Sequence, residues 1–176
     1  MRCDKYRQNI WWLPKKSAKL RAELRYLSIT AMATLVFASA TDIDRWAATR
    51  ASQERVPELL RRLVYATTEA PTLVDFPSGD AVQLDGWDGA VELNEDHPII
   101  PKGASVWETG TSKTPKKKAD EDYEKRTKAP PVTARGPVVL SETAFVFVTP
   151  RRWAGKEKWA AERRGEKKWR DKFVPL

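Results

Sequence analysis

The sequence predicts an α/β protein with a central mixed β-sheet flanked by helices. Two observations favour this class. Segments with helical character lie before, between and after short runs rich in Val, Trp, Phe and Thr, which are typical of strands. The chain has 176 residues, of which 41% are hydrophobic and eight are Trp, and this is enough for one core of ordinary size.

The chain is predicted to hold one folded domain, residues 32–176, preceded by a basic extension with helical potential, residues 1–31. Met32 is a candidate for the true start of the protein. Residues 128–137 are predicted to form a flexible connection because they combine proline, glycine and small residues. The final strand, begun by residues 170–176, is expected to be cut short where the sequence ends.

Two helices are predicted before the first strand. A capping pattern from Ser39 to Asp42 opens the first of them. The second covers residues 56–67, and Pro57 suits its first turn, where no N–H is needed. Its apolar face is made by Leu59, Leu60, Leu63 and Val64.

The later elements follow from short apolar runs separated by turn residues. Strands are predicted over residues 72–76, 81–93, 104–110 and 143–150. Thr114 and Pro115 open a helix to about Thr127, which carries lysine–carboxylate pairs four residues apart. A basic helix over residues 155–169 precedes the last strand. The predicted order is therefore α, β, β, β, α, β, α, β.

The net charge of +8 is distributed unevenly along the chain. Residues 1–30 hold eight basic and two acidic residues, and residues 151–176 hold ten basic and four acidic residues, so the middle is acidic. A basic periphery around an acidic centre suits a polyanion that must meet bound cations. The alternative interpretation is two solvated runs of charge.

The small numbers of cysteine and histidine residues exclude several kinds of site. Cys3 is the one cysteine, which excludes an intramolecular disulfide and a cysteine-based zinc site. His97 is the one histidine and lies in a turn-like sequence before Pro98, so we expect it in a surface loop. A histidine-based metal nuclease, a Ser-His-Asp triad or a deaminase zinc site is therefore hard to build.

One apolar segment bears on localisation. Residues 27–40 follow a basic stretch and end in an Ala-x-Ala-like site, a pattern that resembles a secretory signal. The segment is shorter than the ~20 residues that span a bilayer. The basic region before it is unusually long and contains Trp11 and Trp12. We therefore expect a cytoplasmic protein with no membrane partner.

Two carboxylates on neighbouring predicted strands indicate the chemistry. Side chains alternate between the faces of a strand, so Glu108 shares a face with Val106, and Asp88 is opposite Trp87. If the strands pair, Asp88 and Glu108 converge while Trp87 and Trp107 pack on the other face. Two carboxylates ~4 Å apart repel by roughly 4 kcal/mol at an effective dielectric near 20. A shared proton or a divalent cation relieves this repulsion, and Mg²⁺ prefers carboxylates and water.

A lysine beside such a pair would complete a phosphodiester hydrolase, because it can hold the attacking water or steady a developing negative charge. Lys113 follows Glu108 closely enough to serve. Other interpretations stay open at this point. An Asp flanked by glycine is often a turn residue, and a Glu in a strand or a Lys after one often faces solvent.

The segments VQLDGWDGAVE and PKGASVWETGTSK, with the helix KADEDYEKRT after them, resemble the PD-(D/E)xK restriction-endonuclease-like superfamily. FASATDIDRWA and FVFVTPRRWAGKEKWAAERR add a likeness to nuclease-like domains at the N-terminus of large bacterial proteins, some of them linked to antiphage defence. The resemblance runs from about Met32 to Asp171. It implies a mixed sheet flanked by helices, Mg²⁺-dependent DNA cleavage, with Mn²⁺ as a substitute ion, and further domains or subunits of a defence protein as partners.

By position, the resemblance makes Asp88 the first metal-binding acid and Glu108 the second. The acid-x-Lys spacing of the superfamily would put the lysine at position 110, which is Gly110. Lys113, or Lys118 one turn into the next helix, is expected to supply the charge instead.

Glu58, on the helix before the sheet, resembles the accessory acid of some members. Gln83 and Asp85 are weaker candidates.

Several arginines are predicted to contact the DNA backbone, because a guanidinium matches oxyanion geometry. They are Arg126, Arg151, Arg152, Arg163 and Arg164. A bridge from Arg126 to Asp122 is the alternative. Trp153, Trp159 and Trp169 lie among basic residues, but their spacing favours a core position over base stacking. No feature of the sequence indicates contacts to base edges, so we expect cleavage without sequence specificity. We also expect no small-molecule cofactor. The rival interpretation is a non-catalytic nucleic-acid-binding or partner-docking module on the same fold.

Overall fold

The structure is a computed structural model, and it describes residues 38–77, 86–164 and 169. The chain divides into two units, Met1–Ser39 and Ala40–Leu176, and the fold is that of the second. The predictions for residues 1–31, for Gln83 and Asp85, and for the final strand lie outside the described residues.

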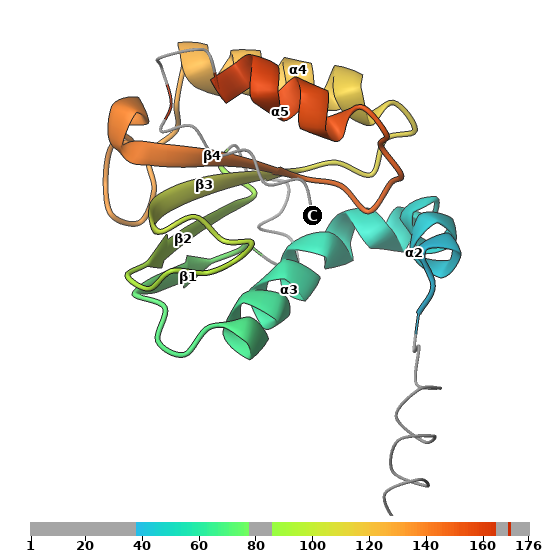
Figure 1. Ribbon diagram of the computed structural model, residues 1–176, viewed down its shortest axis with the longest axis horizontal. Coiled ribbons are helices and arrows are strands. Elements are labelled where there is room, and N and C mark those ends of the chain that lie inside the picture. The colour runs from blue at the N-terminus through green and yellow to red at the C-terminus, as the bar shows by residue number, and fades with distance from the viewer. Residues whose placement is uncertain (1–37, 78–85, 165–168, 170–176) are drawn as a thin grey trace, which may run out of the picture. The chain divides into compact units, whose positions relative to one another are not determined.

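The elements follow each other in nearly the predicted order (Figure 1). They are α2 (Ala40–Ala47), α3 (Arg50–Thr67), β1 (Leu73–Asp75), β2 (Gly89–Leu93), β3 (Gly103–Thr109), α4 (Pro115–Lys128), the 3₁₀-helix η3 (Leu140–Glu142), β4 (Thr143–Val148) and α5 (Lys156–Arg164). The prediction of an α/β fold with a mixed sheet and flanking helices is confirmed.

The sheet has four strands in the order β1-β2-β3-β4. β1, β2 and β3 are antiparallel neighbours, and β3 and β4 are parallel. A parallel pair needs a crossover connection, and α4 lies in that connection. Gly89 pairs with Trp107 at the start of β2. This register places the residue before β2 beside the end of β3, where the two predicted acids lie.

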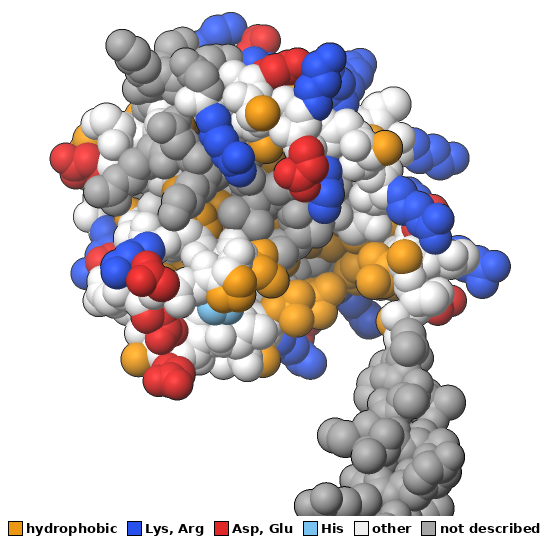
Figure 2. Space-filling view, in the orientation of Figure 1, with side chains coloured by type: hydrophobic (Ala, Val, Ile, Leu, Met, Phe, Trp, Pro, Cys, Tyr) orange, Lys and Arg blue, Asp and Glu red, His pale blue; other side chains and the backbone are white. Residues whose placement is uncertain are grey.

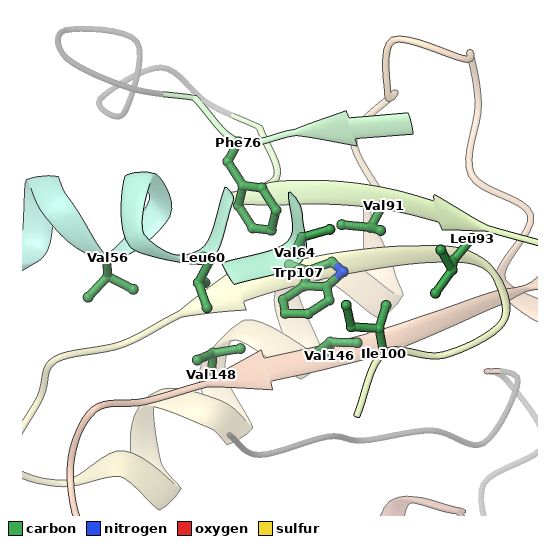
Figure 3. Close-up of a cluster of buried hydrophobic side chains, with 10 residues drawn as sticks. All are labelled: Val56, Leu60, Val64, Phe76, Val91, Leu93, Ile100, Trp107, Val146 and Val148. Carbon is green, nitrogen blue, oxygen red and sulfur yellow. The ribbon is translucent and has the colours of Figure 1, made fainter. Parts of the chain in front are cut away.

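Helices cover both faces of the sheet, α3 on one and α4 with α5 on the other (Figure 1). On the α3 face, one hydrophobic cluster is centred on Trp107, which is 0% exposed. Figure 3 shows its members: Val56, Leu60 and Val64 from α3, Phe76, Val91, Leu93, Ile100, Trp107, Val146 and Val148. The helical spacing of the α3 residues and the alternation in β2 and β4 aim them at this cluster.

The opposite face holds a second, aromatic cluster. Its buried members are Trp87, Val106, Ala119, Tyr123, Phe145, Phe147, Trp159, Ala160 and Trp169. Trp159 and Trp169 are buried here and Trp153 packs against them, which confirms the core interpretation of these residues. The prediction that Trp87 and Trp107 share a face is wrong. β2 begins only at Gly89, so strand alternation does not extend to Trp87.

Pro57 lies inside α3 rather than in its first turn, which corrects a second prediction. The helix begins at Arg50, directly after a turn in which the Ser52 hydroxyl donates to the Thr49 carbonyl at 2.7 Å. A proline in a helix interior removes one backbone hydrogen bond and costs about 3 kcal/mol. Pro57 is fully buried, so the burial of this face of α3 offsets part of that cost.

The outer side of α3 is partly apolar. Leu59 and Leu63 are each 44% exposed, and Figure 2 shows hydrophobic side chains gathered over this helix. The predicted apolar face of this helix is therefore only partly buried: Leu60 and Val64 face the core, and Leu59 and Leu63 do not. Among the described residues, no helix combines the length and the apolar character needed to cross a membrane.

Candidate active site

A cavity of about 690 Å³ lies where the α2–α3 junction, the end of β3 and the start of α4 meet. Its lining residues are Ala47, Ala48, Thr49, Arg50, Gln53, Asp88, Thr109, Gly110, Thr111, Ser112, Lys118 and Arg151. Two of the acid and lysine candidates, Asp88 and Lys118, are therefore brought to one cavity. The sequence interpretation missed Arg50 and Gln53, which also line the cavity. It began the helix at residue 56, whereas α3 begins at Arg50, so these residues were not recognised as its first turn.

Asp88 is anchored to the end of β3. One of its carboxylate oxygens, Oδ2, accepts hydrogen bonds from the backbone N–H and the hydroxyl of Thr109, both at 2.7 Å. Because Gly89 pairs with Trp107, Asp88 lies beside Glu108, one step beyond the ladder. The charge of Asp88 acts on the Glu108 carboxyl, so the two acids are neighbours although Asp88 lies outside the strand ladder.

Glu108 is buried at the end of β3, with only 2% of its surface exposed. Burial is the largest cause that raises the pKa of its carboxyl from 4.5 to about 8; the negative charge of Asp88 acts in the same direction, and the hydrogen bond and charge of Arg126 oppose the shift. Burial thus favours the protonated carboxyl, while the Arg126 guanidinium beside it favours the carboxylate. Asp88 and Glu108 repel each other when both are ionised, and a divalent cation beside them would relieve that repulsion.

Arg126 lies beneath the acids rather than on the surface. Its Nε donates to Glu108, its terminal nitrogen donates to the carbonyl of Gly86, and its guanidinium lies 5.2 Å from the centre of the Trp87 ring. The side chain is 7% exposed. It therefore lacks the free guanidinium that the predicted phosphate contact needs. The alternative bridge to Asp122 is not the pairing found either, since the partner is Glu108.

Lys118 occupies the space into which a side chain at position 110 would extend, the position where the acid-x-Lys spacing would put a lysine. A Cβ on Gly110 would meet the Lys118 Cγ at 2.9 Å and the Phe147 Cζ at 3.1 Å, so the absence of a side chain at position 110 lets Lys118 approach. Its ammonium donates to Asp122 Oδ1 at 2.5 Å. Lys113, by contrast, is exposed and is not among the cavity residues. Of the two candidate lysines, the geometry favours Lys118.

Asp122 adds a third carboxylate that the sequence interpretation considered only as an ion-pair partner. Burial raises its pKa, and so does the charge of Asp88, while the Lys118 hydrogen bond lowers it. Its second oxygen, Oδ2, is buried and has no hydrogen-bond partner among the described residues. The helical spacing of Lys118, Asp122 and Arg126 could have revealed it, because residues four apart share one face of α4.

The charges of this group balance only while one of its carboxyls holds a proton. Asp88, Glu108 and Asp122 contribute three carboxylates, and Lys118 and Arg126 contribute two cations. In the described part of the chain, no group of three or more His, Cys, Asp or Glu side chains is arranged to hold a metal ion. A cation here would therefore use one or two carboxylates together with water and a phosphate, which is the usual coordination of Mg²⁺. The unpartnered oxygen of Asp122 and the excess carboxylate fit such an ion.

The other predicted residues lie outside this group. Glu58 forms an ion pair with Arg62 at 2.5 Å on the surface of α3 and does not line the cavity. Arg151 lines the cavity, but its guanidinium donates to the carbonyls of Thr111, Asp44 and Ala47, so it joins the end of β3 to α2.

The remaining predicted DNA contacts differ in their exposure. Arg152 is exposed and donates to the Thr41 hydroxyl. Arg163 donates to Asp120 at 2.8 Å and lies over the Tyr123 ring. Arg164 is exposed at the end of α5. Arg152 and Arg164 are therefore the predicted contacts most open to a polyanion.

Replacing Gly110 by Ala should lower the free energy of unfolding by about 1–3 kcal/mol, because the new methyl group overpacks against Lys118 and Phe147. Urea denaturation measures the change. Gly86→Ala is the matched control, since a Cβ at that position meets nothing within 4 Å. Equal free energies of unfolding for the two variants would show that the position of Lys118 does not require a glycine at position 110.

Comparisons with protein-family models, with curated proteins and with solved structures found no match.

Proposed function

We propose that this protein is a Mg²⁺-dependent DNA endonuclease without sequence specificity, built on a restriction-endonuclease-like fold. The observation that carries the proposal is a pair of neighbouring acids: Asp88 lines a cavity together with Lys118, and Glu108 is buried close to Asp88. The mixed sheet with helices on both faces agrees with the fold that the sequence resemblance implies.

Asp88 and Glu108 would hold the ion, which when bound polarises a phosphodiester oxygen and lowers the pKa of its bound water. A water oxygen would attack phosphorus as the bond from phosphorus to one ester oxygen breaks; the water gives up a proton to solvent and the released alkoxide takes one up, so the products are a phosphate monoester and a hydroxyl. Lys118 supports the reaction by placing a positive charge beside the phosphate as negative charge develops. Asp122 holds the Lys118 ammonium in place.

The DNA backbone would contact exposed arginines, with Arg152 and Arg164 as the candidates. Contacts to phosphates carry no sequence information, so cleavage at many sequences is expected. By the sequence resemblance, the domain would act in the bacterial cytoplasm as an effector of a larger antiphage protein, or as a remnant of one. Mn²⁺ would replace Mg²⁺.

Incubation of the protein with supercoiled plasmid tests this function. We expect nicked and then linear or degraded DNA with Mg²⁺ or Mn²⁺, and intact plasmid when EDTA removes the ion. Intact plasmid under all conditions, with a correctly folded protein, would contradict the proposal. Linear DNA and single strands as alternative substrates identify the form that is cut.

The second candidate is a non-catalytic nucleic-acid-binding module. The ion pair between Glu108 and Arg126 favours it, because an arginine already neutralises one of the two acids. This candidate predicts binding that weakens steeply with salt, without cleavage by any divalent ion. A partner-docking module predicts no DNA binding even at low salt.

A further inference from the structure

Arg126 bonds to both of the chain segments that carry the proposed metal-binding acids. It donates directly to Glu108 at the end of β3, and it also donates to the carbonyl of Gly86, two residues before Asp88. These partners lie 18 and 40 residues away in the sequence. One side chain from α4 therefore joins two separate segments at the point where the acids meet.

The segment before Asp88 needs such an anchor, because it lies outside the strand ladder. β2 begins at Gly89, so sheet hydrogen bonds do not fix residues 86–88. Besides Arg126, Trp87 holds this segment through its indole N–H, which donates to the Pro131 carbonyl at 2.9 Å. The Trp87 ring in turn supports the Arg126 guanidinium, 5.2 Å away.

We propose that Arg126 is a positioning residue that fixes the carboxylates of Asp88 and Glu108 relative to each other, an inference that rests on the proposed function for its catalytic consequence. The fork of the guanidinium is suited to this, because its nitrogens donate in fixed and divergent directions. A lysine keeps the charge but offers a single nitrogen. It can pair with Glu108 while losing the bond to Gly86.

The alternative is that Arg126 only neutralises a buried carboxylate and so stabilises the fold as a whole. The two roles predict different behaviour of the Thr109 backbone N–H, which donates to Asp88. If Arg126 positions Asp88, its loss frees this one amide. The next amide, on Gly110, donates to the Val148 carbonyl at 3.0 Å and does not involve Asp88, so it is an internal control.

Amide hydrogen exchange followed by NMR on wild type and Arg126→Lys tests the proposal. We expect the Thr109 amide to exchange at least about tenfold faster in the variant, while Gly110 keeps its rate. Equal acceleration of both amides, or of neither, would overturn the positioning role. The Arg126 Nε–H of the wild type gives a second measurement that needs no variant. We expect it to be protected from solvent, and an exchange rate like that of a surface arginine would also overturn the proposal.

Activity assays separate this inference from the proposed function. If wild type cuts DNA, Arg126→Lys should require more Mn²⁺ for half-maximal cleavage and lose more than about tenfold in rate at limiting ion. Unchanged dependence on the ion would contradict the positioning role. If wild type does not cut, but the Thr109 amide alone is released in the variant, the endonuclease proposal fails while the positioning of Asp88 by Arg126 stands.

Discussion

Replacement of Asp88 by Asn should reduce Mg²⁺-dependent plasmid cleavage by at least about 100-fold. The amide keeps an oxygen that can accept the two hydrogen bonds from Thr109, so the local structure should persist. It removes the negative charge, however, and neutral oxygen is a poor substitute for a carboxylate at Mg²⁺. The initial rates of nicking by the two proteins, measured at equal concentration, give the ratio directly.

Glu92→Gln is the matched control for this variant. Glu92 lies on β2, the strand that follows Asp88; its carboxylate lies 3.6 Å from Arg135, and it does not line the cavity. It should retain the wild-type rate within about twofold, because an exposed ion pair contributes little to stability. Equal loss in the two variants would mean that general charge, rather than the position of Asp88, determines the rate.

The second large effect concerns stability and pH. In the absence of divalent ions, the free energy of unfolding should fall as pH rises from about 5 to about 8. Glu108 has a pKa of about 8 in the folded protein against 4.5 for the ordinary group, so in this range the folded state keeps a proton that the unfolded state has lost. Raising the pH therefore favours unfolding, by up to about 1 kcal/mol per pH unit.

Denaturant unfolding at a series of pH values measures this dependence, and Glu108→Gln isolates the group. Glutamine keeps an acceptor for Arg126 but cannot titrate, so the variant should show a flatter curve and should gain on wild type as pH rises. Asp122 also has a raised pKa, and its charge raises that of Glu108, so the difference between the two curves reports the titration of Glu108 together with this coupling. Parallel curves for wild type and variant would show that Glu108 does not carry the proton.

Much of the fold could be predicted because its elements are marked by local patterns. The strands of the sheet combine β-branched and aromatic residues between turns, and α4 begins at the predicted Thr114–Pro115 step. The start of α3 could not be found in this way. Pro57 looks like a first-turn residue locally, and only the packing of a longer helix against the sheet overrides that preference.

The site was predictable only in part, because only Glu108 among its acids lies on a strand, while Asp122 and both cations come from α4. Alternation along β3 gave Glu108 its face, and the register brought Asp88 beside it. Nothing in the local sequence shows that Arg126, on α4, donates to Glu108 at the end of β3. The same holds for Lys118, whose approach depends on Gly110 leaving room between two elements.

Titration of the apo protein with Mn²⁺, followed by the electron paramagnetic resonance signal of the free ion, tests most directly whether Asp88 and Glu108 form a divalent-cation site. At slightly alkaline pH, where Glu108 can ionise, wild type should remove Mn²⁺ from solution in a saturable manner, Mg²⁺ should compete, and Asp88→Asn should lose most of this binding. A free-ion signal that wild type leaves unchanged, or binding that Asp88→Asn retains in full, would contradict the account.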